Sequence, residues 1–201
     1  MEAPQQMIKI TFALLLTSIC VACGAQVKAQ TAATGPTPSG IKGFVFKPAV
    51  AAPSFVLHDQ DGHSIGPKTM RGHWFVVAFL YTHCTDVCPV IASNLGVALR
   101  RLPDLRVLAI SVDPKGDTPA SVRSFLRAHR LPASFRYVTG TRAQLVPVWA
   151  RYHVTAVAGP GSEVSHTTIE LLVDPQGKER VLYDAQVQAT DITVGIKKLS
   201  G

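Results

Sequence analysis

The sequence predicts one α/β domain built around a mixed β-sheet, and three patterns in the chain support this fold class. Two continuous apolar runs, 74–81 and 105–112, have the composition of strands that are buried on both faces. Segments with apolar residues at helical spacing follow them along the chain. Towards the C-terminus, two further apolar runs flank the turn-forming residues 174–177, as in a β-hairpin. Strands that alternate with helices and then end in a hairpin are typical of an α/β fold.

The individual elements follow from local signals. Pro89 suits the first turn of a helix, and Thr118 followed by Pro119 is typical of an N-cap and a first helical position. Asp61 and Gly62 indicate a turn after a short strand. In chain order we expect a strand and turn at 53–62, a strand at 74–81, a helix at 89–102, a strand at 105–112, a helix at 118–130, a strand at 135–138, a helix at 141–152, a hairpin at 167–183 and a helix at 190–199. This order is that of a thioredoxin-like fold, with a mixed central sheet flanked by helices and an N-terminal hairpin extension.

Residues 1–29 are predicted to be an export segment. Lys9 precedes a short apolar run, which matches the basic and apolar regions of a secretory signal. The run is short for a membrane-spanning helix, which needs about 20 apolar residues. Small residues favour cleavage after Ala25 or Ala29, whereas the context of Cys23 also resembles a lipoprotein signal that would make this cysteine the lipidated N-terminus.

Cleavage, lipidation and an uncleaved anchor stay open, and each places the body outside the cytoplasm, on the periplasmic side, soluble or tethered to the membrane. Residues 30–48 are predicted to be a linker because they are rich in Ala, Thr, Gly and Pro. Residues 49–201 form the predicted domain. With 47% hydrophobic residues, the chain needs neither a metal nor a disulfide to build a core.

The charge of the chain gives no indication of nucleic-acid binding. The formal net charge is +7, but the basic residues are scattered and are not interleaved with aromatic residues. A balance of this kind serves solubility, or attraction to an acidic protein surface or to anionic lipids.

The cysteines point to chemistry rather than to structural bridging. Of the four in the chain, Cys20 and Cys23 lie in the export segment, which leaves Cys84 and Cys88 in the body. A pair four residues apart closes too small a loop to constrain the unfolded chain much. It sits where the first buried strand meets the first long helix, and residues i and i+4 share one helical face. Thiolates favoured by a helix N-terminus are soft ligands that suit Cu(I) first and zinc next.

Three segments in order give the chain a specific resemblance. Residues 79–89 read FLYTHCTDVCP, residues 111–119 read SVDPKGDTP and residues 173–177 read VDPQG. Together they resemble the Sco/SenC family, and the similarity runs from about Pro53 to about Tyr183. Two positions depart from the family pattern: Thr85 stands where Pro is usual, and Ser165 replaces an acidic residue.

The resemblance implies a site and a function. It implies one copper ion, as Cu(I) or Cu(II), held by Cys84, Cys88 and His166, and a metallochaperone that supports assembly of the dinuclear copper centre of cytochrome c oxidase by ligand exchange. The implied partners are the copper-accepting oxidase subunit, a thiol reductant that keeps the pair from forming a disulfide, and a copper donor protein. The alternative, an enzyme, is an extracytoplasmic thiol–disulfide oxidoreductase that uses Cys84 and Cys88 as its redox pair.

Three further residues are candidates for supporting or partner contacts. His83 precedes the first cysteine, and strand alternation favours a packing or supporting role for it. Asp86 lies between the cysteines, as a solvated residue or as a partner contact. Asp113 ends the second buried strand, as a turn residue before a proline or as a neighbour of the site. The other histidines are predicted to lie on the surface: His58, His63, His73, His129 and His153.

Overall fold

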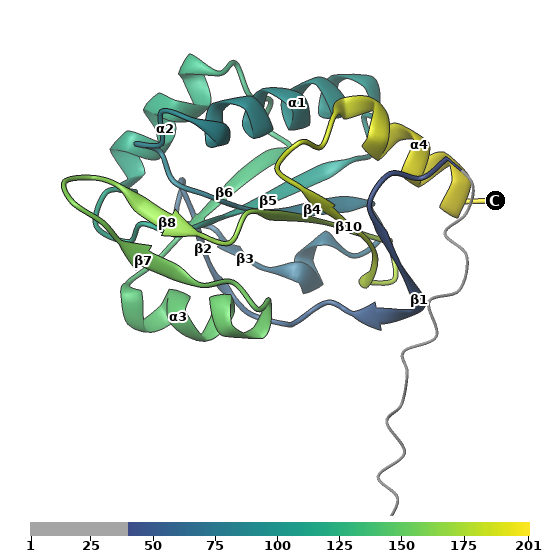
Figure 1. The fold of residues 1–201 in the computed structure, drawn as a ribbon, viewed down its shortest axis with the longest axis horizontal. Coiled ribbons are helices and arrows are strands. Elements are labelled where there is room, and N and C mark those ends of the chain that lie inside the picture. The colour runs from purple at the N-terminus through teal and green to yellow at the C-terminus, as the bar shows by residue number, and fades with distance from the viewer. Residues whose placement is uncertain (1–39) are drawn as a thin grey trace, which may run out of the picture. The chain divides into compact units, whose positions relative to one another are not determined.

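A computed structural model describes residues 40–201 of the chain (Figure 1). The predicted export segment, with Cys23, and the first part of the predicted linker lie outside the described residues. The described strands are β1 (Phe44–Ala51), β2 (Leu57–Asp59), β3 (Ser64–Ile65), β4 (Phe75–Leu80), β5 (Arg106–Ser111), β6 (Phe135–Thr139), β7 (Ala156–Ala158), β8 (Val164–His166), β9 (Ile169–Val173) and β10 (Lys178–Asp184). The helices are η1 (Pro67–Met70), α1 (Val87–Arg101), α2 (Pro119–Ala128), α3 (Arg142–Arg151) and α4 (Ala189–Leu199).

The strands form one mixed eight-stranded sheet in the order β1-β10-β9-β4-β5-β6-β2-β3, and β7 pairs with β8 in a separate ribbon. Strands β4, β5 and β6 are parallel, whereas β9, β10 and β1 continue the sheet with antiparallel pairing. The antiparallel pair β2–β3 is the N-terminal hairpin. The predicted mixed α/β fold is therefore confirmed.

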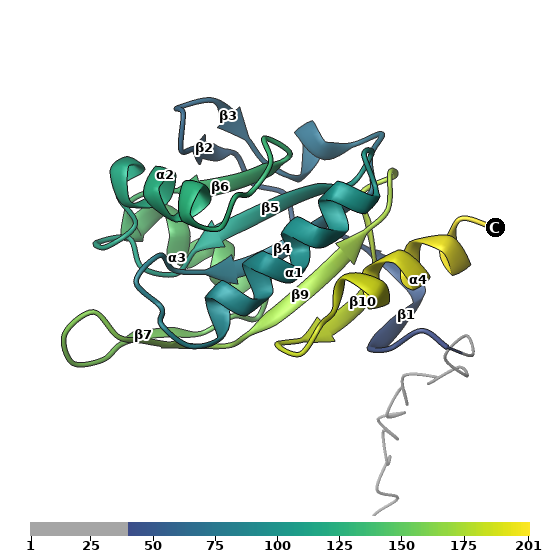
Figure 2. The ribbon, with the colours of Figure 1, turned by 90° about the horizontal axis from the view of Figure 1, so that it is seen from above.

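Helices cover both faces of this sheet. Figures 1 and 2 show α1, α2 and α4 over one face and α3 over the other. Every residue of β4 is buried, as expected for a strand enclosed on both sides. The predicted cap of α2 is confirmed, because the hydroxyl of Thr118 accepts the backbone N–H of Ser121 at 3.1 Å and Pro119 is the first helical residue.

Two features differ from the sequence-based expectations. Strand β1 begins at Phe44, so residues 44–48, which we expected in the linker, belong to the edge of the sheet. Its partner β10 lies more than a hundred residues further along, and local patterns do not carry such a long-range pairing. The ribbon of β7 and β8 was also not predicted, because its two short strands are largely exposed and lack an apolar pattern.

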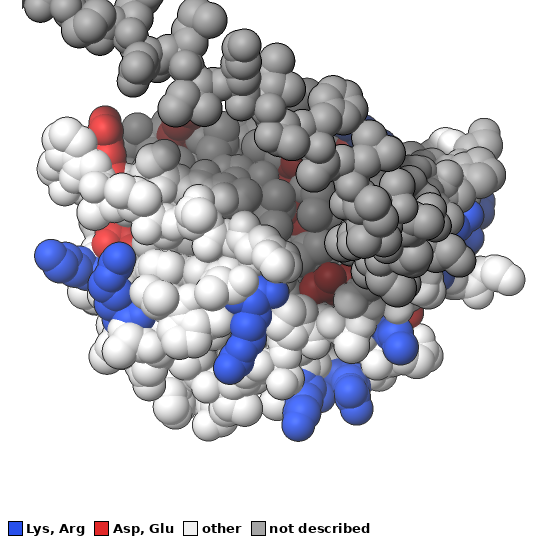
Figure 3. All heavy atoms as spheres, turned by 60° about the horizontal axis from the view of Figure 1, so that its bottom comes forward, with Lys and Arg blue, Asp and Glu red and all other residues white. Residues whose placement is uncertain are grey.

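One face of the described residues is mostly uncharged around separate basic side chains. On the face seen in Figure 3, Lys and Arg side chains stand in separate groups on a mainly uncharged surface. Within residues 40–201, every helix is too short or too polar to cross a bilayer.

Candidate metal centre

The two cysteines lie where β4 ends and α1 begins. Cys84 is in the connecting loop, and its backbone N–H donates to the carbonyl of Tyr81 at 3.3 Å. Cys88 is the second residue of α1. Both thiols are free and buried, with 8% of Cys84 and 0% of Cys88 exposed. We expected both on one helical turn, but α1 begins at Val87, so Cys84 precedes the helix.

The sulfur of Cys84 caps the helix. The backbone N–H of Cys88 donates to Sγ of Cys84 at 3.4 Å, and the side chain of Asp86, the residue before the helix, makes no capping hydrogen bond. The first N–H groups of a helix have no partner inside it and carry a partial positive charge. This charge favours a thiolate at Cys84 over a thiol.

The two thiols differ in acidity. Burial opposes ionisation of Cys84, yet hydrogen bonds from the Cys88 thiol, from the N–H groups of Cys88 and Asp86 and from the Tyr81 hydroxyl lower its pKa below the ordinary value. Burial instead raises the pKa of Cys88 well above its ordinary value, and the charges of Cys84 and Asp117 raise it further. Cys84 is therefore the thiol that ionises first.

Tyr81, which the sequence analysis did not single out, links the thiols to the imidazole of His166. Its hydroxyl lies within hydrogen-bonding reach of Cys84. Its ring packs edge-on against the ring of His166, with centroids 5.9 Å apart and planes at 84°. The sequence signal for Tyr81 is its place at the end of the buried apolar run, directly before the residues that lead to the first cysteine.

His166 is the last residue of β8, and its ring is oriented by the next residue. Its Nδ1 lies 2.9 Å from the carbonyl oxygen of Thr167. Because a carbonyl only accepts, Nδ1 donates, and the lone pair of Nε2 stays available as a ligand. Burial lowers the pKa of His166, and the hydrogen bond to Thr167 opposes this, so the neutral ring that a metal needs predominates near pH 7.

The three predicted ligands lie near Tyr81, but their donor atoms are too far apart to bind one ion in this arrangement. Within residues 40–201, the donor atoms of Cys84, Cys88 and His166 do not all lie within 4.8 Å of one another, as those of two other groups do. The thiols are held by the sheet and α1, whereas His166 is held by the β7–β8 ribbon. A bound ion therefore requires the imidazole and the sulfurs to approach each other.

One of these other groups lies beside the cysteine loop. Donor atoms of His83, Asp113 and Asp117 lie within 4.8 Å of one another. The sequence analysis named the first two but missed Asp117, although it lies in the quoted segment 111–119. The Asp117 carboxylate accepts hydrogen bonds from the Thr82 N–H at 2.8 Å, the Ser111 hydroxyl at 2.6 Å and the Tyr137 hydroxyl at 3.0 Å, and so joins the cysteine loop to the end of β5.

Asp86 lies on the other side of this loop. It is exposed and lines a cavity of about 410 Å³ between the cysteine loop and the β7–β8 ribbon, together with Tyr81, His83, Glu163 and Ser165. The two carboxylates give this cavity an acidic border next to the site.

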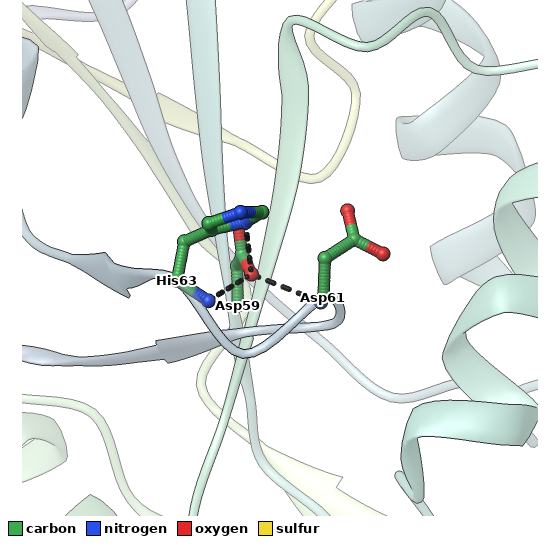
Figure 4. A group of neighbouring side chains, drawn as sticks. All are labelled: Asp59, Asp61 and His63. Carbon is green, nitrogen blue, oxygen red and sulfur yellow. Dashed lines mark hydrogen bonds and ion pairs between the residues drawn. The ribbon is translucent and has the colours of Figure 1, made fainter.

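The second group is formed by Asp59, Asp61 and His63 in the turn between β2 and β3 (Figure 4). Asp59 accepts the N–H groups of Asp61 and His63, each at 2.9 Å, and its Oδ1 is 3.4 Å from Nδ1 of His63. Arg136 forms ion pairs with Asp59 at 3.3 Å and Asp61 at 3.4 Å. These carboxylates are neutralised and serve to hold the turn.

The fold and the site together define a class: a thioredoxin-like domain with a free, asymmetric dithiol at the end of a central strand. The SCO1/SenC family model matches residues 46–201, and the chain belongs to this family. A human protein named SCO1 homolog, mitochondrial, is 32% identical over 143 residues, which cover 66% of this chain and 46% of the human protein. A putative copper-binding protein of Stutzerimonas stutzeri is 30% identical over 139 residues, which cover 65% of this chain and 67% of that protein.

The solved structures of relatives agree with the fold. The crystal structure of Arabidopsis thaliana ScoI with copper bound matches with a TM-score of 0.68 at 25% identity, over 74% of this chain and 97% of that chain. The chain thus spans almost all of this solved domain but less than half of the human relative.

Proposed function

We propose that this protein is an extracytoplasmic copper metallochaperone that supports assembly of the dinuclear copper centre of cytochrome c oxidase. The observation that carries the proposal is the pair of free thiols, one of lowered pKa, beside an imidazole whose Nε2 is available. Membership of the SCO1/SenC family and the copper found in a related structure support it.

Cys84, Cys88 and His166 are the proposed ligands. Two sulfur donors suit Cu(I), and an added imidazole nitrogen suits Cu(II) as well. A three-ligand set of this kind leaves positions open, so that incoming thiolates or imidazoles of a donor or acceptor replace its ligands one at a time. The cavity beside Asp86 and Glu163 offers such groups a place next to the cysteine loop.

In the proposed mechanism the thiols stay in place and only the β7–β8 ribbon, which carries His166, moves. The thiols are buried at the junction of β4 and α1, so the β7–β8 ribbon is the part that brings His166 towards them. The proposed partners are the copper-accepting oxidase subunit, a copper donor and a thiol reductant that returns an oxidised pair to free thiols. The proposed location is the periplasmic side, soluble or tethered through the N-terminus.

Copper titration of the reduced full chain tests this assignment. We expect one copper bound at the thiol site, identified by its sulfur absorption, and His166→Ala is expected to weaken Cu(II) binding at this site by about tenfold or more, followed by absorption and electron spin resonance. The matched control is His58→Ala, which removes an exposed imidazole on β2. Cu(II) spectra and affinity that stay the same in the His166 variant would remove this residue from the site.

A second candidate function is thiol–disulfide exchange, which the unequal thiols favour. The Cys84 thiolate would attack one sulfur of a substrate disulfide and release the other as a thiolate, and Cys88 would then attack Cys84 and release the reduced substrate. His166 has no part in this reaction. Normal disulfide-reductase turnover in His166→Ala, together with unchanged copper binding, would favour this candidate.

A further inference from the structure

His83, Asp113 and Asp117 form a cluster of potential metal ligands beside the cysteine loop. Donor atoms of these three residues lie within 4.8 Å of one another, yet no hydrogen bond or ion pair in the described part of the chain joins the imidazole to either carboxylate. Two metal–ligand bonds of about 2.0–2.2 Å each span donors up to about 4 Å apart. Small side-chain rotations therefore bring these donors onto one ion.

The charge of this cluster separates it from the other aspartate–histidine group. The turn between β2 and β3 has Arg136 paired with both of its carboxylates. Among the ion pairs of residues 40–201, none involves His83, Asp113 or Asp117. The cluster of His83, Asp113 and Asp117 thus lacks a cation like the Arg136 guanidinium, which neutralises the group at Asp59 and Asp61.

The chain leaves room for these donors at Gly116. A Cβ added to this glycine would collide with both the carboxylate of Asp113 and the Nδ1 of His83. The backbone of Gly116 is not in the left-handed region, so this position does not need glycine for its conformation. The missing side chain is what lets the imidazole and the carboxylate face each other.

Existing contacts leave lone pairs for an ion on all three residues. Asp117 is the most occupied, because its Oδ2 accepts the Ser111 and Tyr137 hydroxyls and its Oδ1 accepts the Thr82 N–H, which leaves one lone pair on Oδ1. Asp113 Oδ1 accepts the N–H of Lys115 at 3.2 Å, and the hydroxyl of Thr82 lies 3.3 Å from Nδ1 of His83. The ring of His83 is exposed and borders a cavity of about 310 Å³, together with Ser121 and His129. The imidazole is therefore reachable from solvent on this side.

We propose that His83, Asp113 and Asp117 bind a second divalent metal ion, separate from the thiol site, with Cu(II) as the preferred ion. An imidazole with carboxylate oxygens is a donor set for Cu(II), and Cu(II) binds such donors more tightly than the other divalent first-row ions. The thiols suit Cu(I). The chain therefore presents a nitrogen–oxygen site directly next to a sulfur site, one suited to each oxidation state.

The test uses Cu(II) alone and a full chain with Cys84→Ser and Cys88→Ser, so that the soft donors of the proposed thiol site are absent. Electron spin resonance should report one Cu(II) per chain with a nitrogen ligand. Adding His83→Ala or Gly116→Ala should weaken this binding by about tenfold or more. The matched controls His63→Ala, from the cluster with Arg136, and His58→Ala, an exposed imidazole on β2, should leave it unchanged.

Equal Cu(II) binding with and without His83→Ala would overturn the proposal, as would loss of the nitrogen signal in either control instead. If circular dichroism shows that the serine variant does not fold, copper is counted on the chain with intact thiols. Two ions per chain should then fall to one in His83→Ala, and a constant count would overturn the proposal. The thiol site of the proposed function is read separately by its sulfur absorption, so each assignment can fail without the other.

Discussion

The cysteine loop and the β7–β8 ribbon meet at the same place in the molecule but are held there by different forces. The loop joins two buried elements, β4 and α1, and Cys88 is itself 0% exposed. The ribbon has only two three-residue strands, and Val157 within it is 65% exposed. The comparison indicates that the thiols form the fixed part of the candidate centre and the imidazole its adjustable part.

The largest effect is expected at the fixed part. Cys88→Ala removes one of two soft donors, and the imidazole does not replace a thiolate for Cu(I). We expect Cu(I) affinity to fall by about a thousandfold, or about 4 kcal/mol, in competition with a chromophoric Cu(I) chelator. His166→Ala serves as the comparison, with a Cu(I) loss of less than about tenfold. Equal losses in the two variants would contradict a division into fixed and adjustable parts.

A second prediction concerns Glu170, which the sequence analysis missed and which lies in the sheet beside the strand that leads to the cysteine loop. It is on β9, paired with Ala78 of β4, and both of its carboxylate oxygens are buried without a hydrogen-bond partner. Burial raises the pKa of Glu170 to about 8, and the nearby Asp184 adds to the rise. Glu170 lies inside the apolar run of the predicted hairpin, and the hairpin pattern alone does not mark it as a residue of unusual acidity.

Proton binding by Glu170 determines whether the free energy of unfolding rises or falls with pH. Between the ordinary pKa of 4.5 and about 8, the folded chain keeps a proton on Glu170 that the unfolded chain has lost. The free energy of unfolding therefore falls as pH rises through this window, by up to about 1.4 kcal/mol per pH unit.

We expect Glu170→Met to flatten this fall, measured by urea unfolding at pH 6, 7, 8 and 9. The part that remains near neutral pH is assigned to Glu179, because burial raises the pKa of this residue to about 7. Wild-type and variant curves that stay parallel over the whole range would show that Glu170 does not titrate in this window.

A third prediction tests the link between the two regions through Tyr81. Tyr81→Phe removes the hydroxyl that helps to lower the pKa of Cys84, while the aromatic ring that packs against His166 remains. The pKa of Cys84 should rise, which is measured by the pH dependence of thiol alkylation in a Cys88→Ala background. An unchanged alkylation profile would show that the helix N-terminus alone sets this acidity.

The smallest effect is expected at the base of the ribbon. The hydroxyl of Thr167 accepts the N–H of Thr155 at 3.2 Å and lies 3.1 Å from the hydroxyl of Thr155. Thr167→Val keeps the shape but removes these bonds, each worth about 1 kcal/mol. Cu(II) affinity should fall by about fivefold or less, with Cu(I) affinity unchanged. A larger loss of Cu(I) than of Cu(II) would contradict the assignment of the ribbon to the imidazole alone.

The sequence correctly predicted the elements that depend on patterns within a few neighbouring residues. The buried strand before Cys84, the cap at Thr118 and the C-terminal hairpin all follow from patterns within a few residues. It did not reach β1 or the ribbon, because the first depends on pairing with a distant strand and the second has no apolar face. In the candidate site, Tyr81 and Asp117 were missed because their roles come from contacts across loops.

The capping of α1 by the sulfur of Cys84 links the chemical state of that sulfur to a backbone amide of the helix. The amide hydrogen of residue 88 is shared with the Cys84 sulfur, which is a proposed metal ligand, so any ion or oxidant on that sulfur competes for the same electron density. Hydrogen exchange at this single amide thus reports on loading from within the protein backbone.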